Sequence, residues 1–303
     1  HREAPLVQVK SDTPFKTQEK YVASLFLPRS KIDGEITKVT DDEILIKNDK
    51  GETQLDRYEK NFPLNQKTFL HTDIHVKKGD KVKPNQLLGD SIYTKDGNLA
   101  IGTNMRVGYM TYKGLTINDG VVVSESGAKK LTSLHMNKVM YNEDDAHVAS
   151  KDKYTSLFPN KFSYDQLKDI QSSGVVKKGS KLQEGDPIVL AVEKTELTAE
   201  QSMLGQLHKK LYKPYRDDAI VWNHSFEGDV VDVSDMGKRK VILIRSEQPA
   251  VIGDKISQRS AGKGIITAVV KDDDMPQDES GRTLDMLMSP TGVVSRQNPA
   301  QIL

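Results

Sequence analysis

The fold of this chain is most constrained by a short pattern of valine, lysine and glycine that occurs in two places. Residues 76–82 read VKKGDKV, and residues 176–182 read VKKGSKL. A glycine between two short runs that contain apolar residues indicates a strand, a tight turn at the glycine, and a second strand. The valine-rich segments 173–194 and 224–234 carry further glycine turns. The pattern predicts a mainly β chain with short helices, and it supports an all-β core more than a duplication.

Other stretches predict local structure without chemistry. Residues 35–39 and 43–47 alternate apolar and polar side chains and are joined by turn residues, so they predict a hairpin. Residues 154–170 predict an amphipathic helix. His71 and His75 are four residues apart, a spacing that on a helix would place both on one face and suit a metal ion. Their surroundings are typical of strand and loop, so a structural role is the alternative.

Charge is balanced over the whole chain but concentrated in one segment. The 303 residues carry 44 bases and 43 acids, a net charge of +1, so binding to nucleic acid must be local. In residues 253–264, Lys255 and Lys263 lie close to Gly253, Gly262 and Gly264, and a glycine lets the backbone come close to a ligand. A lysine ammonium is a compact charge that suits phosphate. The alternative is a solvated, glycine-rich surface turn.

The sequence also excludes some classes of protein. It has no cysteine, which removes disulfides and thiolate zinc sites. It has no apolar run long enough to cross a bilayer and no start typical of a signal peptide. These features predict a soluble intracellular protein.

Two long segments resemble one protein family. Residues 253–303 contain, in order, the strings GDKISQRSAGKGI, DDMP and MSPTGVVSRQNPAQIL, and residues 99–126 read LAIGTNMRVGYMTYKGLTINDGVVVSES. Together they closely resemble the second-largest, or beta, subunit of multisubunit DNA-dependent RNA polymerases of the bacterial type. Departures such as RSAGKG for RHGNKG and INDG for FEDA indicate a divergent member. They suggest a phage-encoded polymerase whose subunits are split among several chains.

The resemblance implies a fold and an order of domains. The fold is a double-psi β-barrel with an inserted flap or wall domain of the sandwich-barrel hybrid type. The expected domains are a hybrid-binding tail and β-rich connector in 1–98, the first barrel part in 99–130, the flap in 131–245, and the second barrel part with the lysine pair in 246–303. The two barrel parts would share one site, although the flap separates them in the sequence.

The resemblance also implies roles for individual side chains in nucleotidyl transfer. Lys255 and Lys263 would hold phosphates of the RNA 3′ end and the incoming nucleotide, and Arg296 would grip the triphosphate with two nitrogens. Asp119 would lie near a second magnesium ion. Beside it, Asn118 stands where the family has an acid, so it offers a carbonyl oxygen without charge. Further nucleic-acid contacts are expected at two arginines, Arg2 and Arg259. The alternative role for Arg259 is to anchor its own loop.

The resemblance implies several partners as well. The family's aspartate triad for Mg²⁺ belongs to the largest subunit, and no such string occurs here. Without a beta-prime-like partner, this chain would therefore be inactive in nucleotidyl transfer. Other beta-like segments, template DNA, the RNA transcript and nucleoside triphosphates are also expected, in the cytoplasm of a bacterial host cell. Within 197–210, an apolar stripe would dock a sigma-like initiation factor, or else pack in a core: Met203, Leu204 and Leu207.

Two other functions fit parts of the sequence. A non-catalytic, nucleic-acid-binding β-barrel scaffold is compatible with the missing aspartate triad, but it does not need both lysines and Arg296. A two-barrel polymerase that copies RNA templates would carry both barrels in one chain. The helix expected at 197–210 favours the bacterial-type transcriptase over this second alternative.

Overall fold

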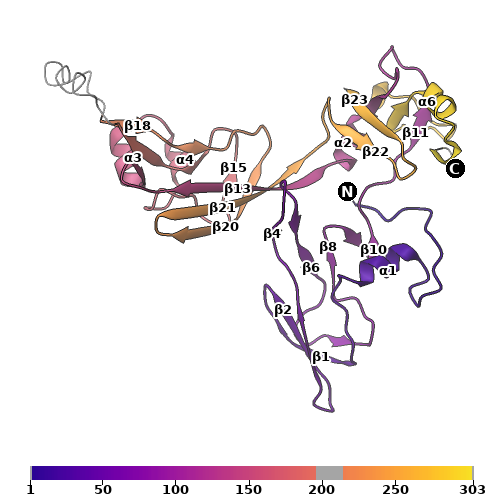
Figure 1. The fold of residues 1–303 in the computed structure, drawn as a ribbon, viewed down its shortest axis with the longest axis horizontal. Coiled ribbons are helices and arrows are strands. Elements are labelled where there is room, and N and C mark those ends of the chain that lie inside the picture. The colour runs from indigo at the N-terminus through magenta and orange to yellow at the C-terminus, as the bar shows by residue number, and fades with distance from the viewer. Residues whose placement is uncertain (1, 196–213, 302–303) are drawn as a thin grey trace. The chain divides into compact units, whose positions relative to one another are not determined.

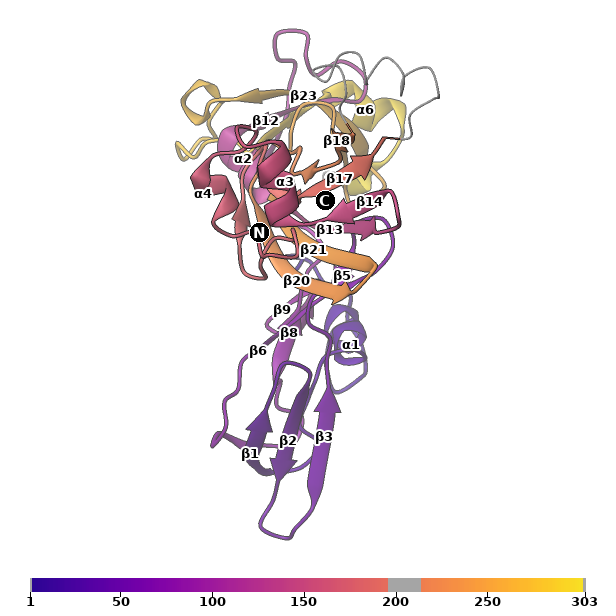
Figure 2. The same ribbon diagram turned by 90° about the vertical axis from the view of Figure 1, so that its left-hand side faces the viewer.

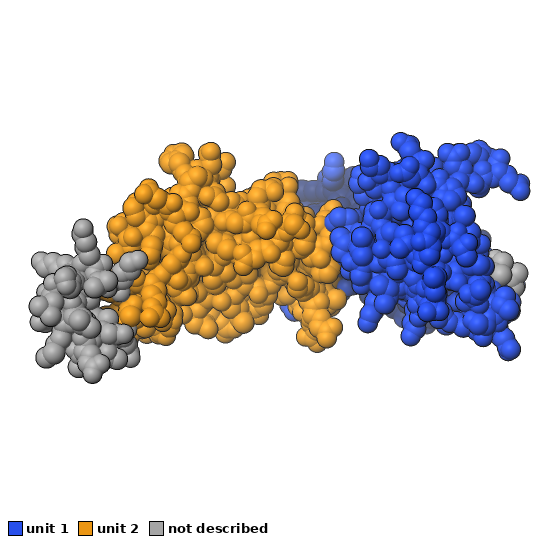
Figure 3. Space-filling view, turned by 90° about the horizontal axis from the view of Figure 1, so that it is seen from above, with its two compact units in different colours: residues 1–62, 70–133, 249–303 blue, residues 63–69, 134–248 orange. Residues whose placement is uncertain are grey.

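The computed structural model describes residues 2–195 and 214–301, which form two compact units. Unit 1 comprises residues 1–62, 70–133 and 249–303, and unit 2 comprises residues 63–69 and 134–248; Figure 3 draws them in blue and orange. The helix predicted at 197–210, with Met203, Leu204 and Leu207, lies outside the described residues. Among the helices of the described part, none is long and apolar enough to cross a membrane.

The first part of unit 1 is built from short strands. Its elements are α1 (Gln18–Ser24), β1 (Gly34–Val39), β2 (Glu43–Lys47), β3 (Thr53–Arg57), β6 (Thr72–Ile74), β7 (Lys81–Val82), β8 (Gly89–Ser91), β9 (Thr94–Lys95) and β10 (Asn98–Leu99). One sheet has the order β3-β2-β1-β7, and Figure 2 shows β1, β2 and β3 side by side. The antiparallel pairing of β1 with β2 confirms the predicted hairpin.

The second part of unit 1 is a five-stranded sheet formed by two distant stretches of sequence. Its elements are β11 (Val107–Tyr109), β12 (Gly120–Ser124), α2 (Glu125–Lys130), β22 (Lys255–Ser257), β23 (Lys263–Val270), the 3-10 helix η1 (Asp272–Asp274), β24 (Met286–Met288), α6 (Pro290–Ser295) and the 3-10 helix η2 (Pro299–Gln301). The strand order is β11-β24-β12-β23-β22. The central strand β12 runs parallel to β23 and antiparallel to β24, and Figure 1 shows this group of elements together.

The central strand of this sheet is buried on both faces. All five residues of β12 are buried, which explains its unbroken run of valines. Val121 and Val123 pack with Ile266 and Met286, whereas Val122 packs with Leu287. The sheet therefore fixes the residues at both ends of β12 and at the start of β23.

The described part of unit 2 is a β structure with two short helices. Its elements are β14 (His147–Ala149), α3 (Lys151–Leu157), α4 (Tyr164–Leu167), β15 (Lys181–Leu182), β16 (Pro187–Val189), β17 (Ala191–Lys194), β18 (Tyr215–Asp217), β19 (Ile220–Val221), β20 (Gly228–Met236) and β21 (Arg239–Gln248). Three further strands include residues of both units: β4 (Phe62–Pro63), β5 (Phe69–Leu70) and β13 (Ser133–Asn142). The main sheet has the order β13-β21-β20-β15. The core beneath it contains the fully buried Trp222 and Tyr154.

The prediction of one helix across residues 154–170 was wrong. The structure has α3, which ends at Leu157, and a separate α4, which begins after Ser163. Pro159 explains the break, because a proline disfavours helical backbone at the preceding residue, and Phe158 has φ −130° and ψ 60°. Ser163 then caps the new helix with a capping box that includes Gln166.

The described residues are mainly β-strand with a few short helices, which confirms the coarser prediction of fold class. The five-stranded sheet is a curled half-barrel. The finer description of this sheet as part of a double-psi barrel stays a prediction.

Candidate functional site

The two predicted lysines lie on neighbouring strands at one edge of the five-stranded sheet. Lys255 begins β22 and Lys263 begins β23. The antiparallel register pairs Lys255 with Ile265 and Ser257 with Lys263. Paired residues of antiparallel strands project to the same side of the sheet. Both exposed lysines therefore share one face, where a chain of phosphates could contact the two ammonium groups.

The glycine after Lys263 serves packing within the chain. A Cβ atom at Gly264 would lie 2.4 Å from Cγ2 of Val121 and 2.9 Å from the carbonyl oxygen of Asp119. The next residue, Ile265, donates its backbone N–H to that carbonyl oxygen at 2.8 Å. The expectation that this glycine makes room for a ligand was therefore wrong, because β12 occupies the space.

A pocket in unit 1 brings four of the predicted site residues together. Asn118 and Asp119 precede β12, Lys263 begins β23, and Arg296 follows α6. The rest of the pocket is lined by Tyr109, Gly120, Val121, Met288, Ser289, Gly292 and Gln301. Lys255 does not line this pocket. The pocket thus combines two cations, one carboxylate and two amides from three parts of the sequence.

Arg296 is held at this pocket by an ion pair that no sequence pattern predicts. Pro290 lies in the first turn of α6, where its missing N–H costs no hydrogen bond, and Arg296 is the C-cap of this helix. Its guanidinium Nη2 donates to the Oδ1 atom of Asp119. The two side chains are 44% and 39% exposed, so the pair is open to solvent and to a competing anion.

Arg259 lies in the turn between the two lysines and contacts the N-terminal segment. Its Nη1 donates to the carbonyl oxygen of Val7 at 2.8 Å, and its Nη2 forms an ion pair with Glu19 at 3.2 Å. The Glu19 side chain is only 8% exposed. These contacts match the alternative in which Arg259 anchors its own loop.

Arg2 lies elsewhere in unit 1. Its Nη1 donates to the carbonyl oxygen of Ser91 at 2.9 Å. Burial lowers the pKa of Arg2, and the nearby carboxylates of Asp73 and Asp90 oppose that shift. Arg2 is therefore partly desolvated and engaged with β8.

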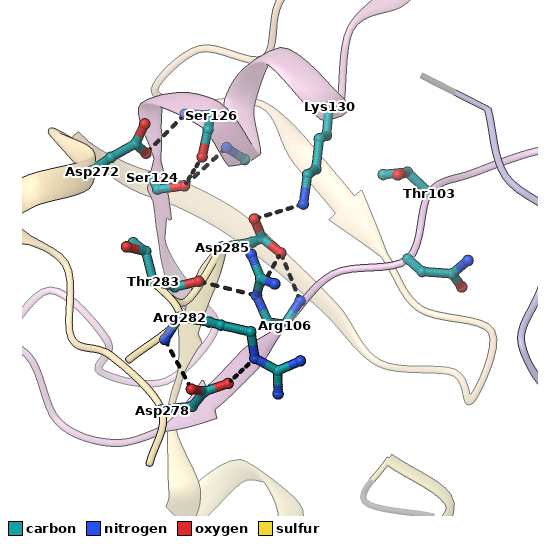
Figure 4. Close-up of polar contacts among 12 residues, drawn as sticks. Thr103, Arg106, Ser124, Ser126, Lys130, Asp272, Asp278, Arg282, Thr283 and Asp285 are labelled. Atoms are coloured by element: carbon teal, nitrogen blue, oxygen red, sulfur yellow. Dashed lines mark hydrogen bonds and ion pairs between the residues drawn. The ribbon is translucent and has the colours of Figure 1, made fainter. Parts of the chain in front are cut away.

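A buried carboxylate supports the strand that leads to α6. Asp285, whose side chain is 3% exposed, accepts a hydrogen bond from Nζ of Lys130 at 2.8 Å. It also accepts one from the backbone N–H of Arg106 at 2.8 Å, and the Arg106 guanidinium lies 3.9 Å away (Figure 4). Asp285 precedes β24, Arg106 precedes β11 and Lys130 ends α2. No sequence pattern indicates a role for this trio, because its members are far apart in the chain.

Two further carboxylates near this trio are used by backbone amides. The pKa of Asp278 falls to about 2, chiefly because it accepts from the backbone N–H of Arg282 (Figure 4). The pKa of Asp272 is lowered because it accepts from the backbone N–H of Ser126, at the start of α2. Both carboxylates thus accept hydrogen bonds from backbone amides of unit 1 and have a structural role.

The donor set of unit 1 does not fit a metal ion held by this chain alone. In residues 2–195 and 214–301, no three His, Asp or Glu side chains are grouped to hold a metal. Mg²⁺ prefers several oxygen ligands, whereas Asp119 already pairs with Arg296. His71 follows β5 and bonds Asp73 at 3.1 Å, and neither it nor His75 lies on a helix. The premise of the histidine metal site was therefore wrong.

Comparison with known proteins points to one family. The family described as RNA polymerase Rpb2, domain 6, matches residues 29–303. The chain belongs to this family. The matched Rpb2 domain 6 region contains both lysines, Asp119 and Arg296, so the pocket lies wholly within it.

The relatives of this Rpb2 domain 6 chain include bacterial DNA-directed RNA polymerase subunits beta. The chain is 31% identical to that of Acetivibrio thermocellus over 90% of its length, 32% to that of Clostridium tetani over 93%, and 30% to that of Treponema denticola over 91%. These matches cover 23%, 24% and 25% of the three relatives. The chain thus spans about a quarter of the length of the curated relatives it matches.

Proposed function

We propose that this Rpb2 domain 6 chain, as part of a beta-like subunit, contributes phosphate-binding side chains to the active site of a DNA-directed RNA polymerase. The observation that carries the proposal is the pocket in which Lys263 and Arg296 converge, with Lys255 on the same face of the sheet as Lys263. Lys263 and Arg296, from two separate sequence motifs, line one pocket, and Lys255 begins the neighbouring edge strand. This arrangement is what a triphosphate and an RNA 3′ end require.

The three cationic side chains would neutralise negative charge on the reacting phosphates. In nucleotidyl transfer, the RNA 3′-hydroxyl attacks the α-phosphate of a nucleoside triphosphate, and pyrophosphate leaves. Lys255 and Lys263 would hold phosphates of the transcript end and the nucleotide as point charges. Preorganised cations of this kind stabilise the charge that builds up in the transition state.

Arg296 would change partner when the nucleotide binds. Its guanidinium now pairs with Asp119, which keeps it at the pocket. A triphosphate offers more negative charge than one carboxylate, and it can accept two parallel hydrogen bonds from the planar guanidinium. Asn118, with φ +56°, would add amide contacts at the pocket without charge. Asp119, once released, would lie near the second magnesium ion that arrives with the nucleotide. We assign Arg259 to anchoring its loop.

The proposal assigns Mg²⁺ to the partner chain. The family uses this ion, but the described residues lack a fitting donor set, so the ligands would come mainly from a beta-prime-like subunit. Other beta-like segments, template DNA and the transcript complete the proposed complex, in the bacterial cytoplasm. Within it, we assign 99–130 and 246–303 to a double-psi barrel and 131–245 to a flap.

Primer extension by the assembled complex tests the proposal. The chain is co-expressed with a beta-prime-like subunit and the other beta-like segments, and extension of an RNA primer on a DNA template is followed with Mg²⁺. Lys255→Ala and Lys263→Ala should each reduce the rate at least about tenfold, or about 1.4 kcal/mol of transition-state stabilisation. The matched control is Lys81→Ala, because Lys81 is an exposed lysine in β7 of the four-stranded sheet of unit 1. It should extend like the wild type.

The alternative functions give different outcomes in the same assay. If complexes lacking both lysines assemble and extend at the wild-type rate, the lysines are surface charge and the chain is a scaffold. If the complex extends primers on RNA templates but not on DNA templates, the RNA-templated polymerase replaces the proposal.

A further inference from the structure

The turn that joins the two lysine strands has a strained backbone. It spans residues 258–262, and Ala261 has φ +63°, a left-handed conformation that a residue with a Cβ atom adopts at a cost. Within the turn, the backbone N–H of Gln258 donates to the carbonyl oxygen of Gly262 at 2.7 Å. A strained turn keeps one conformation only where its surroundings hold it. The position of Lys263, the next residue, therefore depends on those surroundings.

The segment after α6 holds this turn. The Asn298 side chain donates from Nδ2 to the carbonyl oxygen of Ser260 at 2.6 Å. A Cβ atom added to Gly262 would lie 2.7 Å from Nε2 of Gln301, so that side chain lies directly against the turn. The Gln301 carbonyl oxygen in turn accepts from the hydroxyl of Tyr109 in β11 at 2.9 Å. The segment is thus fixed to the sheet at one end and to the turn in its middle.

The same segment also carries Arg296. Asn298 lies two residues after Arg296, and two residues span at most about 7 Å of extended chain. Arg296 pairs with Asp119 next to β12, and Asn298 bonds the turn before β23. One short stretch of chain therefore sets the guanidinium and the second lysine relative to each other.

We propose that Asn298 is a positioning residue, whose hydrogen bond to Ser260 aligns the lysine turn with the segment that carries Arg296. This inference rests on the proposed function, because it assigns a common ligand to Lys263 and Arg296. The Asn298 side chain would not touch that ligand itself. Loss of its hydrogen bond would leave Arg296 able to bind a triphosphate, while Lys263 would no longer be aligned for transfer.

Hydrogen exchange in the assembled complex tests the hydrogen bond without using activity. Exchange of the Gln258 amide reports the turn, because this amide closes it. Asn298→Ala removes the side-chain donor, and Asn298→Asp keeps the shape but carries an acceptor-only carboxylate at neutral pH. Both should speed exchange at Gln258 at least about tenfold. The control is Gln297→Ala, a change at the exposed neighbouring residue, which should exchange like the wild type.

Steady-state primer extension tests the alignment. Asn298→Ala and Asn298→Asp should lower kcat about tenfold and change KM for the nucleoside triphosphate by less than about twofold, since misplacement of a reacting group lowers rate more than ground-state binding. A variant that merely failed to assemble would instead lose active sites and leave both constants of the remaining complexes unchanged. If Asn298→Ala does not assemble, the isosteric Asn298→Asp decides.

The outcomes separate this inference from the proposed function. Wild-type exchange and wild-type kcat in both Asn298 variants would overturn the inference, as would faster exchange with unchanged kcat. If the Lys263→Ala complex extends like the wild type, the proposed function has failed, and the inference fails with it, even where exchange shows that the bond holds the turn. If Lys263→Ala is impaired and the Asn298 variants are not, only the inference has failed.

Discussion

The two VKKG segments, one in each unit, are held by the same backbone hydrogen bonds, although the chain reaches them in opposite order. In unit 1, the N–H of Gly79 donates to the carbonyl oxygen of Ile36 at 2.7 Å, and the Ile36 N–H donates to Asp80 at 2.9 Å. In unit 2, the corresponding bonds join Gly179 to Val230 at 2.7 Å and Val230 to Ser180 at 2.9 Å. The hairpin precedes its VKKG segment in unit 1 and follows it in unit 2. Hydrogen bonding thus fixes this arrangement independently of chain order.

The hairpins of the two units also share their irregularity. The pairing of β1 with β2 shifts register between Ile36 and Lys38, and the pairing of β20 with β21 shifts between Val230 and Asp232. Both shifts therefore begin at the residue that bonds the VKKG turn. A bulge increases the local twist of a strand, which lets each hairpin bend at the turn it holds.

The cores beneath the two copies differ in size. The core around Ile36 has six buried apolar side chains among the described residues, whereas the core around Val230 has sixteen, including Trp222 and Tyr154. Hydrophobic stabilisation grows with the apolar area buried. The same local motif therefore rests on unequal support, and equivalent substitutions should have unequal consequences.

Truncation of the central apolar residue should give the largest effect. Ile36→Ala should cost about 3 kcal/mol and open the small core, and Val230→Ala should cost about 2 kcal/mol, because fewer methyl groups are removed. Exchange of the Gly79 amide measures the first change. Fluorescence of Trp222, the single tryptophan, measures the second during urea unfolding. Val251→Ala, at a residue that is 55% exposed, is the control and should change stability by less than about 0.5 kcal/mol. Equal costs at both sites would contradict this order, because Ile36→Ala removes more buried apolar carbon than Val230→Ala.

Filling the glycine that begins each hairpin strand should give the next effect. A Cβ atom at Gly34 would lie 2.4 Å from the backbone oxygen of Lys47, so the strand itself must move, at a cost of about 2–3 kcal/mol. At Gly228 it would meet side-chain atoms, Cγ2 of Ile244 at 2.7 Å and Cε2 of Trp222 at 3.0 Å. Side chains can shift more easily, so Gly228→Ala should cost about 1–2 kcal/mol.

The same two probes measure these variants. Gly228→Ala should also change the emission of Trp222 in the folded state, because the indole must move. Gly102→Ala is the control, since no atom lies within 4 Å of its added Cβ. A larger loss of stability at Gly228 than at Gly34 would contradict this order. It would show that side chains in the sixteen-residue core shift less easily than the backbone near Gly34.

Alanine in the VKKG turns should give the smallest effect. Gly79 has φ +95° and Gly179 has φ +88°, and an added Cβ would meet no atom within 4 Å at either position. Only the backbone conformation resists the change, so both variants should lose about 1–2 kcal/mol, equal within about 0.5 kcal/mol. Asparagine tolerates this region better than alanine, so Gly79→Asn and Gly179→Asn should lose less. Unequal losses would show that the two turns are not equivalent.

Local pattern predicted part of this structure well. The alternation at 35–39 and 43–47 predicted the β1–β2 hairpin because strand periodicity is a property of adjacent residues. The single helix predicted over 154–170 was wrong because Pro159 disfavours helical backbone at Phe158, so α3 ends at Leu157. The role assigned to Gly264 failed for another reason: the atoms that need the space, in Val121 and Asp119, belong to a distant strand.

The sequence by itself determined the mainly β character of the chain, its repeated turn pattern and the residue types of the proposed phosphate site. Tertiary structure alone decided which of them meet. Three contacts join residues that are far apart in the chain: the ion pair of Arg296 with Asp119, the hydrogen bond from Asn298 to Ser260, and the ion pair of Lys130 with the buried Asp285. No local sequence pattern predicts such contacts, because they depend on strand order and register in the five-stranded sheet.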